Sequence, residues 1–324
     1  MVDILMSGCS QGLIWAILAL GVYLSYRILD VADLSCEGCI TLGASVAALL
    51  IWKEVNPILA VIVAFFAGAL AGVVTGLLQT KLKVPPILAG ILTMISLYSI
   101  NIHIMSIASG SEGTANLSLL NFRNGTLYAQ LSKLLNLNKS VASLIIGGVV
   151  CVLVMLALYW FFGTELGSAI RATGNNEKMC RAQGINTDTT KIIGLALSNG
   201  LIAVSGAFLC QYQSYSDVNM GVGAIVIGLA SIIIGEALFA KAKHFFLMLL
   251  GIVVGSIVYR VVVALVIFSG MPSTDLKIMT AVVVIVALCI TRFGTRFKRK
   301  SGKNKKQKVK KTEITAEKEG GEHV

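Results

Sequence analysis

Apolar runs of about 20 residues recur along the whole chain, and they restrict its fold more than any other feature. Each run is long enough to cross a hydrocarbon core of about 30 Å as a helix. In lipid every backbone N–H and C=O group needs a partner inside the protein, and a helix supplies one within its own segment. Strands of a membrane barrel alternate apolar and polar residues, whereas these runs do not. With 56% hydrophobic and only 13% charged residues, the sequence predicts an all-α, polytopic transmembrane helix bundle of about 8–10 membrane segments.

Nine runs carry this prediction, and two of them are short. We place them at about 4–26, 38–52, 58–78, 87–107, 141–162, 192–209, 221–240, 245–268 and 276–290. Lys and Arg gather in alternate loops, which by the positive-inside rule assigns those loops to the cytoplasm.

The net charge of +11 comes from one end of the chain. Residues 292–311 hold eleven Lys or Arg and no acid, whereas the remaining residues balance at 16 basic and 16 acidic. We therefore divide the chain into a membrane domain at 1–297 and a basic tail at 298–324, expected to be disordered and cytoplasmic. Such a tail suits anionic lipid headgroups. Nucleic-acid binding is not expected, because nothing folded accompanies the tail.

A polar loop at 163–191 interrupts the apolar runs and carries both charge signs. Its middle predicts a short helix, with Asn175 or Asn176 as the cap and Gly184 just past its end. Three apolar residues at helical spacing form a narrow edge on this helix: Met179, Ala182 and Ile185. The loop is either a docking element for a soluble partner or a solvated loop with a helical turn. Thr187 or Asp188 is expected to cap the helix that follows.

Other polar residues fall where lipid would disfavour them. The acidic segment after the first run either lines a path through the bundle or is an ordinary cytoplasmic turn. The predicted path residues are Asp33, Ser35, Glu37, Ser96, Asn101 and Asp217.

Glycines at every fourth position predict close helix packing in the third run. Gly68, Gly72 and Gly76 make one smooth face for a neighbouring helix. Cys36 and Cys39 form a C-x-x-C without a second pair, so no metal site is predicted.

Three patches resemble the permease subunits of ABC importers of the branched-chain amino-acid type, a family that also includes ribose and other sugar permeases. They lie at 12–44, 166–186 and 198–235. The second patch, LGSAIRATGNNEKMCRAQGIN, is the most specific. Its matching residues are Gly167, Ala169, Arg171, Ala172, Asn175, Gly184, Ile185 and Asn186. The overall pattern is most similar to the branch that works with a lipoprotein of the aromatic amino-acid-binding kind.

The resemblance implies a coupling helix in the second patch that docks into a cytoplasmic ATPase subunit. The implied coupling residues are Gly167, Arg171, Asn175, Glu177, Met179, Arg181, Gly184 and Ile185. It also implies a bacterial plasma membrane, a second permease copy as a homodimer or with a close relative, and an extracytoplasmic substrate-binding protein near 108–140 and 211–220. The solute would be small and polar, most simply an amino acid.

The chain itself is not expected to be an enzyme or to bind a cofactor. It has no G-x-x-x-x-G-K-[ST] loop to cradle phosphate, so ATP and Mg²⁺ would bind the partner subunit. It also lacks H-E-x-x-H. The alternative function is an ion-coupled secondary transporter that uses Asp33, Glu37 or Glu236. Against it, the sequence shows no internal repeat with paired broken helices.

Overall fold

The computed structural model describes residues 2–122, 125–134, 136, 138–239, 244–268, 278, 280–282 and 284–286. The basic tail at 298–324 lies outside the described residues, as does much of the ninth run. In chain order the elements are α1 (Val2–Tyr23), the π-helix η1 (Leu24–Ile28), α2 (Cys36–Trp52), α3 (Pro57–Thr80), α4 (Pro86–Ser109), β1 (Asn116–Ser118), α5 (Leu127–Leu134), α6 (Lys139–Phe161), α7 (Glu165–Asn175), α8 (Glu177–Ala182), α9 (Thr187–Gln213), β2 (Tyr215–Asp217), α10 (Ala224–Leu238) and α11 (Phe245–Phe268).

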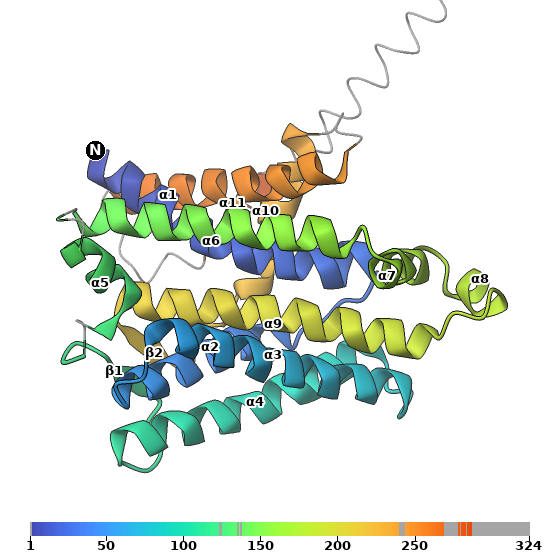
Figure 1. Cartoon of the computed structure of the whole chain (residues 1–324), viewed down its shortest axis with the longest axis horizontal. Helices are drawn as coiled ribbons and strands as arrows, with labels where there is room; N and C mark the ends of the chain where they lie inside the picture. The colour runs from blue at the N-terminus through green and yellow to red at the C-terminus, as the bar shows by residue number, and fades with distance from the viewer. Residues whose placement is uncertain are drawn as a thin grey trace, which may run out of the picture.

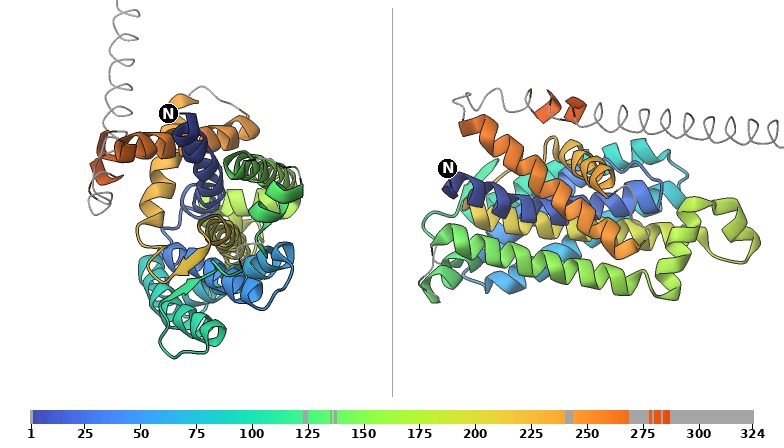
Figure 2. Two further views of the ribbon diagram at one scale, coloured as in Figure 1. Left: turned by 90° about the vertical axis from the view of Figure 1, so that its left-hand side faces the viewer. Right: turned by 90° about the horizontal axis from the view of Figure 1, so that it is seen from above.

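The predicted all-α membrane bundle is confirmed. Among the described residues, six helical segments are long and apolar enough to span a membrane, namely α1 with η1, α3, α4, α6, α9 and α11. Two shorter apolar helices, α2 and α10, correspond to the runs at 38–52 and 221–240. The long helices run roughly side by side, with α9 in the middle of the bundle (Figures 1 and 2).

The two ends of the bundle differ in structure (Figure 1). At one end, β1 and β2 form an antiparallel ribbon that pairs Asn116 with Asp217, and α5 lies beside it. We call this the ribbon end; the N-terminus lies there too. At the opposite end, α7 and α8 project beyond the long helices, and we call this the α7–α8 end. The sequence did not predict the ribbon, because its two strands are only three residues each and 96 residues of chain separate them.

Close contact with α9 holds α3 in place. The glycines on α3 turn their backbone toward α9: a Cβ on Gly72 would overlap the carbonyl oxygen of Leu195, and one on Gly68 would overlap that of Asn199. Gly76 similarly lies against Ile192. Since lipid is as apolar as the helix surfaces, such close packing replaces the hydrophobic effect as the force between membrane helices.

We expect Gly72→Ala to destabilise the bundle by about 1–3 kcal/mol, because the added methyl group pushes α3 away from α9. Gly148→Ala on α6 is the matched control, since no atom of the described residues lies within 4 Å of its Cβ position. The measurement is thermal unfolding of both purified variants in one mild detergent. Equal midpoints for the two variants would show that the α3–α9 contact is not tight.

Candidate functional site

The loop at the α7–α8 end folds as two helices rather than one. The sequence pattern did not predict α7, which Thr164 caps through a hydrogen bond from the Gly167 N–H to its Oγ1 at 3.3 Å. Thr173 on α7 hydrogen-bonds Thr190 on α9 at 2.9 Å. On its other side, Gly174 lies so close to the Ile28 carbonyl that a Cβ would collide with it. The helix α7 therefore packs between α9 and η1.

The second helix, α8, is the one the sequence predicted. Asn176 is its cap and accepts from the Met179 N–H at 3.0 Å. Gly184, two residues past its end, has φ of +82°, a conformation that suits glycine. The prediction that Thr187 or Asp188 caps α9 is wrong. Asn186 does so, because its Oδ1 accepts from two N–H groups of the first turn, each at 3.2 Å.

Glu177 ties α8 to the start of α9. One carboxylate oxygen accepts from Lys191 Nζ at 2.7 Å, and the other accepts from Arg181 at 2.8 Å. Arg181 also donates to the Thr187 hydroxyl at 2.8 Å. The hydrogen bond from Lys191 lowers the pKa of Glu177 below its ordinary value of 4.5, and the charge of Arg181 lowers it further. Burial alone would raise this pKa, but its effect is smaller.

This network turns the apolar edge of α8 outward. Met179 is 43% exposed and Ala182 is exposed, whereas Cys180 is fully buried. Arg171 on α7 stacks over the ring of Phe245, with 4.3 Å between the guanidinium carbon and the ring centroid. All eight predicted coupling residues thus lie at one end of the bundle: Gly167, Arg171, Asn175, Glu177, Met179, Arg181, Gly184 and Ile185.

The acidic segment after η1 enters the middle of the bundle. Asp33 is only 4% exposed. Its carboxylate accepts from the Ser35 N–H and from the Asn199 side-chain amide, each at 2.9 Å. The same amide donates to the Ser35 hydroxyl at 3.0 Å. Asn199 is halfway along α9. The sequence did not predict its hydrogen bonds to Asp33 and Ser35. A polar residue within the apolar run, in the stretch LSNGL, is the sequence feature that could have indicated them.

Glu37 joins the two short helices. It lies in the first turn of α2, and its carboxylate accepts from the N–H of Gly223, the residue before α10, at 3.0 Å. Both helices therefore begin inside the bundle, each after a non-helical stretch. The structure thus joins two short helices from distant parts of the chain. The pairing was not visible in the sequence, because the two helices start almost 190 residues apart and share no motif.

The remaining predicted path residues do not converge on one place. Asn101 on α4 is buried and donates to the Gly38 carbonyl at 3.2 Å. Ser96 faces the outside and donates to the carbonyl of Leu92 in its own helix at 2.9 Å. Asp217 lies at the ribbon end and accepts from Asn116 at 3.2 Å.

Three polar residues form a stripe on the exposed side of α4. Ser96, Ser99 and His103 are all exposed. Their spacing of three and four residues puts them on one face of the helix. A polar stripe on a membrane helix is disfavoured against hydrocarbon and favoured against water or protein.

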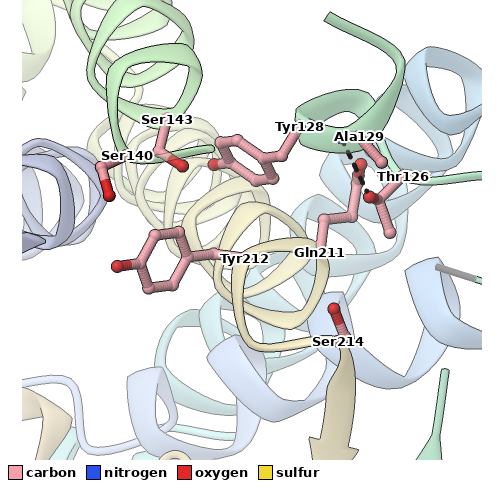
Figure 3. Close-up of a pocket in the computed structure, with 8 residues that line it drawn as sticks. All are labelled: Thr126, Tyr128, Ala129, Ser140, Ser143, Gln211, Tyr212 and Ser214. Atoms are coloured by element: carbon pink, nitrogen blue, oxygen red, sulfur yellow. Dashed lines mark hydrogen bonds between the residues drawn. The ribbon is translucent and has the colours of Figure 1, made fainter. Parts of the chain in front are cut away.

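A polar cavity of about 240 Å³ opens at the ribbon end between α5, α6 and α9 (Figure 3). The buried Gln211 accepts from the Leu127 N–H at 3.1 Å, while its amide nitrogen has no partner among the residues that the structure describes. The Tyr128 hydroxyl also lacks one, and burial raises the pKa of this phenol so that it stays protonated. The residues that line the cavity are uncharged: Thr126, Tyr128, Ala129, Ser140, Ser143, Gln211, Tyr212 and Ser214. It suits water or a neutral polar group.

The described residues contain no group of three or more His, Cys, Asp or Glu side chains that could hold a metal ion. Cys36 and Cys39 are both buried in the first turn of α2. In the described part of the chain they have no further metal-ligating neighbours to complete a site.

We expect Glu177→Gln to loosen α8. The ion pairs require a charged carboxylate, so they are present above the ordinary carboxyl pKa and are lost as pH falls through the lower pKa of the folded state. Amide hydrogen exchange over residues 177–186, measured at neutral pH on the purified chain, should become about two- to five-fold faster. Glu165→Gln in the first turn of α7 is the control, because the described ion pairs do not include Glu165. Equal exchange in both variants would refute the bracing role.

Comparison with known proteins places this architecture in a family. A family model described as "Branched-chain amino acid transport system / permease component" matches residues 4–288. The chain is 38% identical over 299 residues to a tyrosine transport system permease protein of Clostridioides difficile, covering 92% of this chain and 95% of the relative. It is 26% identical over 275 residues to the ribose import permease protein of Escherichia coli K12, covering 85% and 81%.

Two further matches agree with this placement. The chain is 26% identical over 222 residues to the probable branched-chain amino acid transport permease protein LivH of Methanocaldococcus jannaschii, covering 68% of this chain and 69% of the relative. A solved structure described as a metal-chelate-type ABC transporter in an inward-facing conformation shares the fold. Its TM-score is 0.50 at 16% identity, with 90% of this chain and 85% of that chain covered. The chain therefore belongs to the branched-chain amino acid transport system permease family, the multi-pass, non-enzymatic membrane component of ABC importers.

Proposed function

We propose that this chain, paired with a second copy, forms the path by which an ABC importer brings an amino acid across the plasma membrane. The α7–α8 end would lie in the cytoplasm and bind an ATPase subunit, which alone would bind ATP and Mg²⁺. A substrate-binding protein would dock at the ribbon end. The observation that carries the proposal is α8: a short helix whose exposed edge is apolar and whose orientation is held by Glu177, Arg181 and Lys191.

An amino acid is the proposed solute because of the tyrosine transport relative at 38% identity. The ribose import relatives at 26% identity make a sugar the competing outcome. The uncharged cavity at the ribbon end suits contact with the binding protein or with water rather than recognition of a charged amino or carboxyl group. Solute selection would then reside mainly in the binding protein.

The polar stripe on α4 supports the second copy. If this face met lipid, the side chains of Ser99 and His103 would meet hydrocarbon, whereas a path between two copies would hydrate them. In the same orientation, the C-terminal tail would lie against the cytoplasmic leaflet, where its basic residues attract anionic lipid.

Ion-coupled transport fits the described carboxylates less well. Asp33 and Glu37 accept hydrogen bonds from protein donors, and Glu236 is paired with Arg27 at 2.9 Å. These carboxylates hold structural elements together. An ion site would instead need several free oxygen ligands around one position.

Met179→Glu should remove the ATPase subunit. A charge placed on the apolar edge of α8 would be desolvated on docking, so we expect roughly ten-fold or greater loss of co-purifying ATPase. Leu120→Glu, at an exposed apolar residue of the ribbon end, is the matched control and should retain it. The measurement is affinity purification from native membranes in mild detergent, followed by mass spectrometry. Full retention in the Met179 variant would rule out docking through α8, and absence of any ATPase from the native chain would rule out the proposed function.

Ser99→Cys should crosslink two copies under mild oxidation, because the stripe on α4 would face its counterpart. The background is a variant with all seven native cysteines replaced. Leu153→Cys on α6, which is 59% exposed, is the control and should stay monomeric. Non-reducing gel electrophoresis of membranes detects the disulfide-linked dimer. A Leu153 crosslink without a Ser99 crosslink would place the interface on α6 instead.

A further inference from the structure

The ends of α1 and α10 are joined by an ion pair at the α7–α8 end. Arg27 Nε lies 2.9 Å from the Glu236 carboxylate, and both side chains are partly exposed. Glu236 is in the last turn of α10, where the helix dipole disfavours a negative charge. The negative charge of Glu236 is therefore stabilised by Arg27 and not by the dipole of α10.

Arg27 lies within the π-helix η1, a form of helix that is rare and is found mostly at functional positions. Leu29 N–H donates to the Leu24 carbonyl, five residues back, at 3.0 Å. Asp30, just beyond, has a φ of +57°, which is uncommon for a residue with a side chain. If this turn tightened from five-residue to four-residue hydrogen bonds, the residues at its end would rotate about the helix axis. Arg27 would then swing away from Glu236.

The helix α7 is placed to drive such a change. Gly174 packs directly on the Ile28 carbonyl, one residue after Arg27, with no room for a side chain between them. The extended segment that follows is anchored deep in the bundle by Asp33 and Asn199. The helix α1 before η1 and the anchored Asp33 after it are both held in place. A displacement of α7 would therefore move η1, which lies between them.

Free space surrounds the ion pair. A cavity of about 270 Å³ lies on its α10 side, and one of about 900 Å³ lies on its α7 side. Tyr23, Arg27 and Met248 line both cavities. The larger cavity also presents Asp30, a second carboxylate to which a released Arg27 could turn. The Arg27 side chain can therefore move without repacking the core.

We propose that the Arg27–Glu236 ion pair is a latch between α1 and α10, and that α7 opens it through the contact of Gly174 with Ile28. The closed latch holds the state in which the ATPase subunits are apart. The proposal rests on the proposed function, since the force on α7 comes from the docked ATPase. Closure of the ATPase dimer must then supply the free energy that opens the latch.

The test is ATP hydrolysis by the complex purified with its ATPase, without solute. Arg27→Gln and Glu236→Gln remove the attraction, so basal hydrolysis should rise about two- to five-fold, as expected for a partly exposed pair. The double variant Arg27→Glu with Glu236→Arg restores opposite charges and should return the rate to near the native value. Lys81→Gln, a neutralised exposed residue at the end of α3, is the control and should leave the rate unchanged.

Each other outcome has a definite meaning. Unchanged rates in both single variants, or a double variant as altered as the singles, would overturn the latch. Loss of the ATPase from the single variants alone would show that the pair serves assembly instead, and would also overturn the latch. Absence of ATPase from the native complex would defeat the proposed function and the latch together. Gly174→Ala adds an independent arm: by pushing Ile28 away from α7 it should raise basal hydrolysis as the single variants do.

Discussion

The structure depends on satisfying backbone polar groups where water is absent. Helices that cross the whole bundle do this internally, but α2 and α10 start inside it and leave N–H groups free at their first turns. Side-chain carboxylates accept hydrogen bonds from these N–H groups. The Glu37 carboxylate takes the N–H of Gly223, and Asp33 takes that of Ser35. The two acidic residues that are most costly to place in a membrane are thus the ones that allow short helices to begin there.

The second constraint is the close approach of backbones around α9. Gly72 lies against Leu195, and Gly206 of α9 lies against Ile40 of α2, each without space for a Cβ. Asn199, between these contacts, holds the segment that leads into α2. The start of α9 also carries Thr190 and Lys191, which bind α7 and α8. One helix therefore connects the loop at the α7–α8 end, the buried carboxylate and the ribbon end.

This continuity is relevant to transport. A membrane component that does no chemistry can use the energy of ATP only by moving one element against another, and it needs at least two arrangements separated by small differences in free energy. Tight glycine contacts make the interior of the bundle resist gradual deformation. The π-helix η1 and a cavity of about 900 Å³ lie instead at the α7–α8 end. We therefore locate the adjustable part of the molecule next to the element proposed to meet the ATPase.

The sequence by itself determined the features that depend on neighbours along the chain. Apolar run length predicted the spans, including α11 at 245–268 with no change. Cap chemistry predicted that Asn175 or Asn176 caps the short helix, and Asn176 caps α8. The glycine spacing predicted a packing face on α3. Only the tertiary structure decided which distant residues meet: Asp33 with Asn199, Glu37 with Gly223, and Arg27 with Glu236. Run length, periodicity and capping act over a few residues, whereas these pairs are brought together across more than 160 residues by the packing of whole helices.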